Sequence, residues 1–429
     1  MVHHVPARSA ATSPAVQSAP TRSGFRPDVE GLRAVALGLV LLFHAGVPGS
    51  GGGRLGVDVF FVISGFLITG LLVREVERTG RLDLAGFYAR RARRILPAAV
   101  VVLLATLTTT AALAPAQLAT TGRDGLAAAL QLANWRSALA DPMDLHPDAA
   151  ASPLLHYWSL AVEEQFYLLW PPLVLLALAA ARRRGRSSDG PGGTSIRRAL
   201  AVAAGAVAVV SLACSVLLTP VLPTLAYLGT PTRAWQLAAG ALLALAVPRL
   251  QWWSTGTSQR RHLRRWAPAV SWAALAVVLT SSLWTDDVPY PGWAALVPTL
   301  GTVALIAAGI PGLTGASGQG DDGVGARPVG AARLLSARPV RWAGRASYSW
   351  YLWHVPVVFA GEALGVSGWP ALLALELLVA GPLAALTLVV VEQPFRTSPR
   401  FAGARRGLVL GAVATALGVA ASVLAIAAS

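Results

Sequence analysis

The chain has 429 residues, of which 55% are hydrophobic and 13% charged, and its mean hydropathy is +0.57. This composition excludes an ordinary soluble globular protein and is typical of a helical membrane protein with several spans. The net charge of +15 comes entirely from arginine, whose placement along the chain explains it better than nucleic-acid binding does. The single cysteine, Cys214, lies in an apolar run, so we expect neither a disulfide framework nor a cysteine metal site.

Residues 1–24 are rich in Ser, Ala, Pro and Thr, and we expect them to form a disordered cytoplasmic tail. Eleven apolar stretches follow that are long enough to cross a bilayer. They lie near residues 31–48, 57–73, 95–113, 158–181, 199–218, 233–248, 267–284, 293–310, 346–364, 371–391 and 407–427. Continuous Ala, Leu and Val runs lack the alternation of barrel strands, so we predict an all-α, polytopic membrane protein with about 11 transmembrane helices.

The distribution of arginines supports this count of spans. If the N-terminus is cytoplasmic and the sides alternate, 31 of the 35 arginines fall on the cytoplasmic side. The external four are Arg54, Arg123, Arg136 and Arg233. Arginine is costly to move across a membrane. We therefore predict a protein of the bacterial cytoplasmic membrane with its N-terminus inside and its C-terminus outside.

Two connecting segments stand out between the predicted spans. Residues 115–157 form a long external loop, in which 122–141 predicts an interfacial or re-entrant helix. Residues 311–333 are a Gly-rich cytoplasmic linker. The sequence has no internal repeat, which argues against a transporter built from duplicated halves.

The first predicted span carries two polar side chains, Arg33 and His44. Eleven residues make three helical turns plus about 20°, so both side chains project from one face, roughly 16 Å apart along the axis. Such a pair on an apolar span requires a cavity, a partner or a ligand. Arg33 alone fits a positive-inside anchor, and His44 is compatible with either a core histidine or a general base.

Two carboxylates lie where predicted helices enter from the external side. Asp58 opens the second span, and Glu163, about one turn inside the fourth span, shares a helix face with Tyr167. Membrane-interface positions explain the neighbouring aromatic residues, but acids inside a membrane helix are costly. A carboxylate beside an imidazole orients it and raises its basicity, so Asp58 and Glu163 are candidate partners of His44.

Four arginines lie within five residues before the third span, in the stretch "FYARRARRILP". Any cytoplasmic loop attracts arginine, which is the simplest explanation. Guanidinium groups at a helix entrance also bind phosphate oxygens bidentately. We therefore expect a nucleotide or coenzyme A from the cytoplasm to bind Tyr88, Arg90, Arg91 and Arg94.

Two further segments bring polar and aromatic side chains into the predicted helices. "HYWSLAVEEQFYLLWP" (156–171) opens the fourth span, and "SYSWYLWHVPV" (347–357) lies in the ninth. Each segment by itself is typical of a membrane interface. The candidate substrate-binding residues are His156, Ser159, Tyr167, Arg233, Tyr351 and His354.

Together these segments resemble the acyltransferase-3 family of bacterial integral-membrane acyltransferases. The matching motifs occur in order: Arg33-x10-His44, "GVDVFFVISGFLI", Arg91-x-x-Arg94 before "ILP", "WSLAVEEQFY" with Glu163, "RAWQLAAGALLA" around Arg233, and "SYSWYLWHVPV". The resemblance extends from about Phe25 to Arg396, which is nearly the whole predicted membrane portion.

The resemblance implies transfer of an acyl group, usually acetyl, from a cytoplasmic acyl-CoA to a hydroxyl of an acceptor often presented outside. It assigns Arg33 and His44 to the active centre and Arg91 and Arg94 to donor binding. We hypothesise that His44 is the general base and that Arg33 stabilises charge on the donor. Acyl-CoA is then a co-substrate, and we expect no tightly bound cofactor and no metal.

The predicted acceptor is a cell-envelope polysaccharide or glycolipid. One alternative is a natural-product O-acyltransferase acting on a small molecule such as a macrolide, and another is a transporter or flippase. Many members of the resembled family carry an extra SGNH hydrolase-like domain, and we expect either a stand-alone form or a shortened one here. The expected domains are the tail 1–24, an acyltransferase-3 membrane domain 25–396, and a linker with an eleventh transmembrane helix, 397–429.

Overall fold

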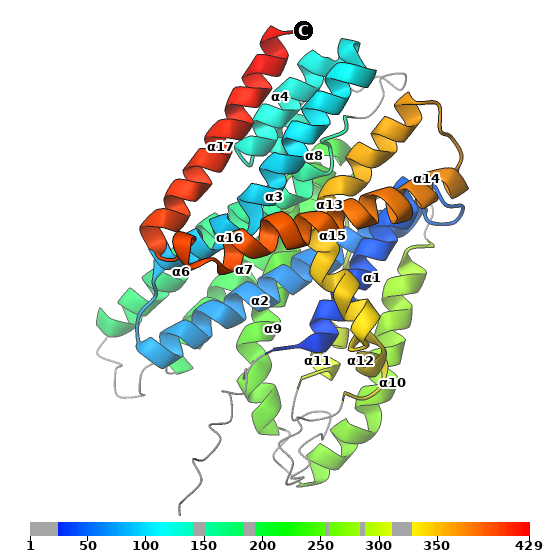
Figure 1. Ribbon diagram of the computed structural model, residues 1–429. Helices are drawn as coiled ribbons and strands as arrows, with labels where there is room; N and C mark the ends of the chain where they lie inside the picture. Colours follow the sequence, from blue (N-terminus) through cyan, green and yellow to red (C-terminus); the bar gives the residue numbers. More distant parts are fainter. Residues whose placement is uncertain (1–24, 140–151, 184–193, 254–256, 284–287, 311–327) are drawn as a thin grey trace, which may run out of the picture.

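The computed structural model describes residues 25–139, 152–183, 194–253, 257–283, 288–310 and 328–429. All regular elements in these ranges are helical, which confirms the all-α prediction (Figure 1). The α-helices are α1 (Pro27–His44), α2 (Gly56–Thr79), α3 (Leu84–Leu113), α4 (Leu118–Ala129), α5 (Ala133–Ala138), α6 (Tyr157–Arg183), α7 (Thr194–Leu218), α8 (Pro223–Leu228), α9 (Thr230–Trp253), α10 (Thr257–Ser281), α11 (Leu296–Ala308), α12 (Ala331–Leu335), α13 (Arg338–Ala363), α14 (Trp369–Leu375), α15 (Gly381–Thr387), α16 (Gln393–Thr397) and α17 (Ala404–Ala427). The predicted tail lies outside the described residues.

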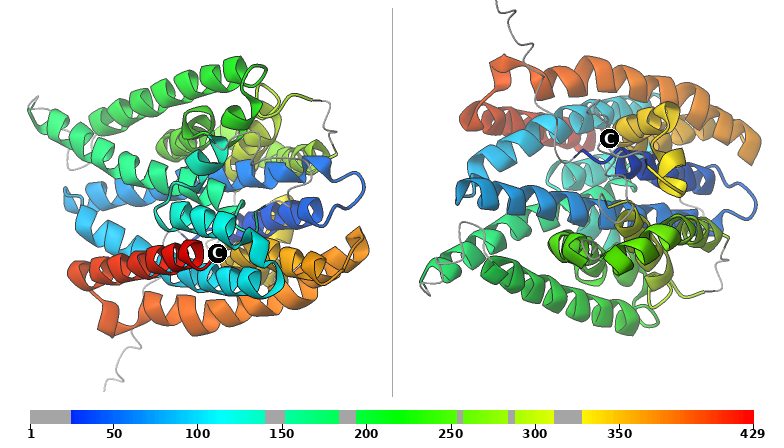
Figure 2. Two further views of the ribbon diagram at one scale, coloured as in Figure 1. Left: turned by 90° about the horizontal axis from the view of Figure 1, so that it is seen from above. Right: turned by 90° about the horizontal axis from the view of Figure 1, so that it is seen from below.

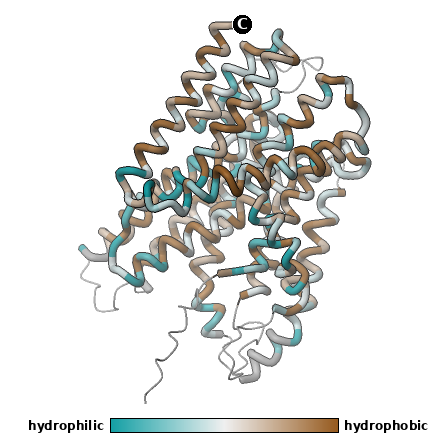
Figure 3. The backbone as a smooth tube through the Cα atoms, viewed as in Figure 1, coloured by the Kyte–Doolittle hydropathy of each residue, from teal (hydrophilic) through white to brown (hydrophobic). Residues whose placement is uncertain are grey.

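The helices are those of an integral membrane protein. Among the described residues, six helical segments are long and apolar enough to cross a membrane. They are Gly51–Thr79, Leu84–Leu113, Tyr157–Ala180, Ile196–Leu218, Trp369–Thr397 and Ala404–Ala427. Hydrophobic residues run along the helices, and hydrophilic residues gather mainly toward helix ends (Figure 3). Each of the eleven predicted spans coincides with a helix or a run of helices, but the count of about eleven and the sides of the termini stay predictions.

One short connection, between α2 and α3, fixes where the basic stretch lies. α2 ends at Gly80, whose φ of 66° is the left-handed conformation that glycine adopts without steric cost. The side chain of Asp83 then caps α3 by accepting a hydrogen bond of 2.8 Å from the amide of Gly86. The four arginines of the basic stretch are therefore in the first turns of α3, with fixed directions, instead of in a loop.

The helix bundle places α1 and α2 between two flanks. Viewed from above and below, α7 and α9 lie on one side of these helices, and α14–α16 with α17 lie on the other (Figure 2). α1 packs against α13, α2 against α9, and α3 against α17. The predicted helix in 122–141 is observed as α4 and α5, and α4 packs against α17. The site residues thus come from the central helices and their immediate neighbours.

Small residues allow α2 and α9 to approach closely. A methyl group added at Gly65 would overlap the backbone carbonyl oxygen of Leu237, and one at Gly240 would overlap that of Val62. Small residues at such crossings let helix backbones touch in membrane proteins. This packing fixes α2, whose opposite face contributes to the candidate site.

We expect Gly65→Ala to lower the temperature of unfolding in detergent, because overpacking at such a contact costs about 1–3 kcal/mol. Gly38→Ala on α1 is the matched control, since nothing lies within 4 Å of its added methyl group. Thermal unfolding followed by size-exclusion chromatography compares the two variants. Equal unfolding temperatures for both would contradict the close approach of α2 and α9.

Candidate active site

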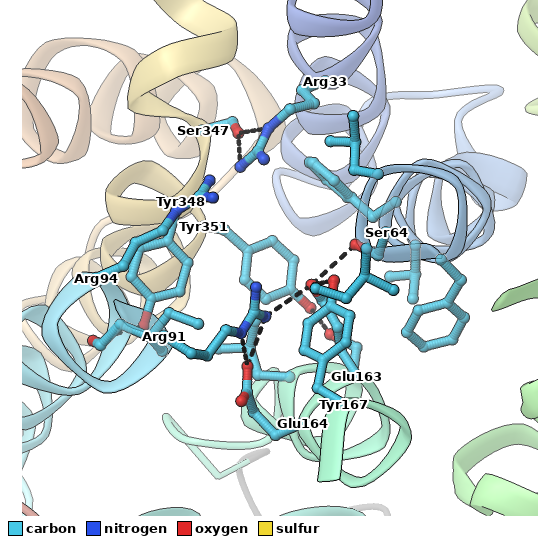
Figure 4. A pocket seen from close by; sticks show the side chains of 18 of the residues that line it. Arg33, Ser64, Arg91, Arg94, Glu163, Glu164, Tyr167, Ser347, Tyr348 and Tyr351 are labelled. Carbon is cyan, nitrogen blue, oxygen red and sulfur yellow. Dashed lines mark hydrogen bonds and ion pairs between the residues drawn. The ribbon is translucent and has the colours of Figure 1, made fainter. Parts of the chain in front are cut away.

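One pocket in the bundle is lined by three arginines and is called here the arginine pocket. It has an empty volume of about 930 Å³, including its open mouth, between α1, α2, α3, α6 and α13 (Figure 4). Its polar lining residues are Arg33, Ser64, Arg91, Arg94, Ser159, Glu163, Glu164, Tyr167, Ser347, Tyr348 and Tyr351. α2 supplies an apolar stripe at helical spacing, which includes Val57, Phe60, Phe61, Ile68 and Leu71.

Arg91 is held by two carboxylates, an arrangement we call the Arg91 clamp. Its Nε and Nη2 donate to Oε1 of Glu164 at 2.9 and 2.6 Å, and Nη2 also donates to Oε1 of Glu163 at 3.1 Å. The guanidinium lies 3.7 Å from the ring centroid of Tyr167. Glu163 accepts two further hydrogen bonds, from Ser64 Oγ at 2.8 Å and from Tyr167 OH at 2.6 Å. Arg91 therefore joins α3 to α6 in the pocket lining through Nε and Nη2, whereas its Nη1 forms no hydrogen bond within the described residues.

Arg33 and Arg94 differ from Arg91 because neither has an ion-pair partner among the described residues. Arg33 donates from Nε and Nη2 to Ser347 Oγ at 3.1 and 3.0 Å (Figure 4). Arg94 forms no hydrogen bond within the described part of the chain, although it lines the pocket. Their two positive charges repel each other, and Glu392 attracts both from beyond ion-pair distance. Two such guanidinium groups facing one pocket can bind an anion, for which phosphate oxygens are well suited.

A second pocket lies toward the opposite end of α1 and is called here the histidine pocket. Its empty volume is about 1260 Å³, including its open mouth. It is lined by His44 and His156 together with the aromatic residues Phe43, Trp158, Tyr227, Tyr290 and Tyr351. Burial raises the pKa of the Tyr227 hydroxyl in α8, so this group remains protonated. The pocket combines flat aromatic surfaces with hydrogen-bonding groups, as sites for polar organic ligands do.

The two pockets meet at Val57 and Tyr351, which line both of them and which we call the wall residues. Arg33 lies in the second turn of α1 and faces the arginine pocket, whereas His44, its last residue, faces the histidine pocket. The expected polar face of the first span is therefore present. It serves two adjoining pockets instead of one.

A backbone carbonyl, and not a carboxylate, orients the ring of His44. His44 Nδ1 lies 2.9 Å from the carbonyl oxygen of Val40, and because a carbonyl can only accept, Nδ1 carries the proton. The lone pair is then on Nε2, which is the form a general base needs. Within the described residues, neither Asp58 nor Glu163 bonds to His44, so the expected carboxylate–histidine contact is not made.

Asp58 is instead part of a buried pair with Arg233. Asp58 Oδ1 accepts from Arg233 Nη1 at 3.1 Å, Asp58 also accepts a hydrogen bond from Tyr290, and both charged side chains are at most 1% exposed. The Arg233 guanidinium lies 4.8 Å from the ring centroid of Tyr227 and 5.5 Å from that of Trp158. The pair holds the aromatic side of the histidine pocket, whose surface Arg233 itself does not line within the described residues.

The remaining predicted residues divide into two groups. Tyr88 donates to the carbonyl of Leu168 at 2.9 Å, and Arg90 pairs with Glu75 at 3.5 Å; as described, neither lines the arginine pocket. Ser159, His156, Tyr351 and His354 come together at the wall, where Ser159 Oγ and Tyr351 OH are 2.7 Å apart. Reasoning from sequence missed Tyr227 and Tyr290, because nothing in their local sequence marks them as pocket residues.

We expect Arg91→Met to destabilise the protein, because it removes the ion pairs that the described structure gives Glu163 and Glu164, a change that costs about 3 kcal/mol. The variant Arg91→Met/Glu163→Gln/Glu164→Gln should recover most of this loss. Arg94→Met is the matched control, since Arg94 has no ion pair among the described residues. Thermal unfolding of the purified proteins measures the effect, and equal destabilisation by Arg91→Met and Arg94→Met would contradict the clamp.

Comparison with known proteins identifies the family. The family described as "Acyltransferase domain" matches residues 26–391. Similar proteins include the putative peptidoglycan O-acetyltransferase YrhL of Bacillus subtilis (strain 168), 30% identical over 384 residues (86% of this chain, 55% of the relative). They also include the O-acetyltransferase OatA of Staphylococcus aureus (strain NCTC 8325 / PS 47), 29% identical over 377 residues (87% and 57%).

The peptidoglycan O-acetyltransferase OatA of Listeria monocytogenes serovar 1/2a (strain ATCC BAA-679 / EGD-e) is 28% identical over 335 residues, covering 77% of this chain and 49% of the relative. No solved structure matches the chain. The chain spans about half the length of the curated relatives it matches. Because the family model covers most of the sequence and the whole central bundle, the chain belongs to the acyltransferase family of integral membrane proteins.

Proposed function

We propose that this protein is a membrane O-acetyltransferase that moves an acetyl group from acetyl-CoA to a hydroxyl of a cell-envelope polysaccharide. The single observation that carries the proposal is the pair of adjoining pockets, which share Val57 and Tyr351. One pocket contains two arginines without an ion pair among the described residues, and the other contains the imidazole of His44, whose Nε2 carries a lone pair. The donor then binds in the arginine pocket and the acceptor in the histidine pocket. The relatives named as peptidoglycan O-acetyltransferases support acetyl as the group and peptidoglycan as the class of acceptor.

Donor binding falls to Arg33 and Arg94 in this proposal. Both guanidinium groups face the arginine pocket without an ion pair in the described chain, so an incoming phosphate displaces no carboxylate. The apolar stripe of α2 offers a surface for the uncharged arm of the thioester. The sequence predicts donor binding for Arg91 as well as Arg94. In this proposal Arg91 instead stabilises the lining of the arginine pocket through its ion pairs with Glu163 and Glu164.

The acceptor hydroxyl is activated by His44. Its Nε2 takes the hydroxyl proton, the oxygen attacks the thioester carbonyl carbon, and the C–S bond breaks to give the ester and the thiolate of coenzyme A. No acyl-enzyme is required by this arrangement. The aromatic residues of the histidine pocket provide flat surfaces on which a sugar ring can stack. In the predicted orientation the donor approaches from the cytoplasm.

Replacing the proposed base should abolish acetyl transfer while the protein still folds and inserts in the membrane. His44→Gln is expected to lower acetyl transfer by roughly 10²–10⁴-fold, the usual contribution of general-base catalysis. The measurement is label from acetyl-CoA recovered on peptidoglycan fragments, with the ester located by mass spectrometry. Wild-type turnover in His44→Gln would contradict the base assignment, and an ester found on a macrolide but never on the glycan would contradict the acceptor.

An arginine that binds the donor and an exposed arginine far from the pocket should differ in their effect on KM for acetyl-CoA. Arg94→Gln is expected to raise KM for acetyl-CoA about tenfold or more, because a charge-assisted hydrogen bond contributes about 1.5–3 kcal/mol. Arg78→Gln, at an exposed arginine near the end of α2, is the matched control and should leave KM unchanged. A KM for Arg94→Gln equal to that of the control would exclude Arg94 from donor binding.

A further inference from the structure

A third cavity, called here the Arg74 pocket, lies between the start of α1, the second half of α2, and the helices α7 and α9. Its empty volume is about 1160 Å³, including its open mouth. The charged side chains that line it are Arg26, Arg74, Glu77 and Arg197. Three positive groups thus face one negative group, so the pocket as described favours an anion.

Arg74 differs from the other two arginines of this pocket in having no partner. Arg26 donates to both carboxylate oxygens of Asp28, at 2.8 and 2.6 Å, and Arg197 donates from Nε to Glu77 at 2.7 Å. Arg74 forms no hydrogen bond and no ion pair within the described part of the chain, and Glu77 attracts it only from beyond ion-pair distance. Its guanidinium is therefore available for the oxygens of a phosphate.

The Arg74 pocket adjoins the arginine pocket along α2. Leu67 lines both pockets, and Leu71, between Leu67 and Arg74, lines the arginine pocket. Side chains on a helix tilt toward its N-terminus. Arg74 Nη1 lies 3.3 Å from the place that a methyl group at Gly70 would take, so the guanidinium leans back along α2 toward the shared residue.

The order of residues along α2 matches the order of groups in the proposed donor. Val57 lies at the wall, and the Arg33 guanidinium lies 6.0 Å from the ring centroid of Phe60. The guanidinium of Arg74 lies beside Gly70, about 20 Å from Val57 at 1.5 Å per residue. In coenzyme A the thioester, the diphosphate and a nucleotide with a 3′-phosphate follow one another along one extended molecule, which is long enough to cover this distance.

The remaining lining of the Arg74 pocket suits the nucleotide. Phe25, which is 53% exposed, and Phe66 offer flat apolar surfaces for an adenine ring. The guanidinium of Arg26 lies 5.8 Å from the ring centroid of Phe66, so positive charge and aromatic surface are side by side. Arg26, Arg74 and Arg197 all belong to segments predicted to be cytoplasmic, the side from which the donor approaches in the predicted orientation.

We propose that the Arg74 pocket is the subsite for the nucleotide end of the donor and that Arg74 binds the 3′-phosphate of coenzyme A. This inference rests on the proposed function. The phosphate oxygens accept hydrogen bonds from the guanidinium, and no covalent bond is made or broken there. Because the 3′-phosphate is remote from the thioester, the contact contributes equally to the bound substrate and to the transition state, and it acts on KM. Arg74 thereby selects coenzyme A over a donor that carries the same thioester arm without this phosphate.

The test compares acetyl-CoA with acetyl-3′-dephospho-CoA, which lacks only the phosphate proposed to bind Arg74. In the wild-type protein we expect KM to be about tenfold or more higher for the dephospho donor, the usual effect of losing a charge-assisted hydrogen bond, with kcat unchanged. Arg74→Gln should raise KM for acetyl-CoA by the same factor and leave KM for the dephospho donor unchanged.

Two further variants serve as controls. Arg78→Gln removes an exposed arginine of the same helix that lines neither pocket, and it should keep the wild-type preference for acetyl-CoA. Arg74→Lys retains a positive charge that binds phosphate, although without the planar fork of arginine, so it should keep part of the preference.

The outcomes separate the subsite from a structural role and from a lipid site. Equal KM values for the two donors in the wild-type protein would overturn the subsite, whether or not any variant folds. A change of KM by the same factor for both donors in Arg74→Gln would also overturn it, because support of the fold or binding of a lipid headgroup would act in that way. Absence of acetyl transfer by the wild-type protein would contradict the proposed function and the subsite together, whereas transfer without preference would contradict only the subsite.

Discussion

The ion pair between Arg91 and the two adjacent glutamates of α6 is the interaction on which the site depends. It ties α3 to α6, and through the hydrogen bond from Ser64 to Glu163 it also fixes α2. Charges inside a membrane bundle must find partners, since leaving one unpaired is costly. Once Arg91 satisfies both glutamates, the pocket keeps its shape and its net positive charge comes from Arg33 and Arg94, which lack such partners within the described chain.

A second buried pair does the same for the other pocket. Asp58 and Arg233 join α2 to α9 and hold Tyr227, Tyr290 and Trp158 around the guanidinium. α2 therefore lines the arginine pocket along one face and reaches the histidine pocket through Val57 in its first turn. The ion-paired side chains stabilise the helix packing around the pockets. Arg33, Arg94 and His44, which have no ion pair among the described residues, line the pockets. In the proposed function, the donor and the acceptor therefore bind in separate pockets and react where the pockets adjoin, at Val57 and Tyr351.

Hydropathy and helical periodicity predicted much of this structure. They located the helices and placed Arg33 and His44 on one interior face, because both follow from local sequence. They could not show that 11 residues of α1 reach two pockets, or that Asp58 pairs with Arg233 instead of His44, since those contacts join residues far apart in sequence. Motif spacing likewise grouped Arg91 with Arg94, although only the three-dimensional partners distinguish a clamped guanidinium from a free one.

The most direct test is a structure with bound dethia-acetyl-CoA, an unreactive analogue in which a methylene group replaces the thioester sulfur. Electron cryomicroscopy should show its phosphates within hydrogen-bond distance of Arg33 and Arg94, its acetyl group against Val57 and Tyr351, and Arg91 still bonded to both glutamates. An analogue seated in the histidine pocket, or one that has pulled Arg91 away from Glu163 and Glu164, would contradict the account.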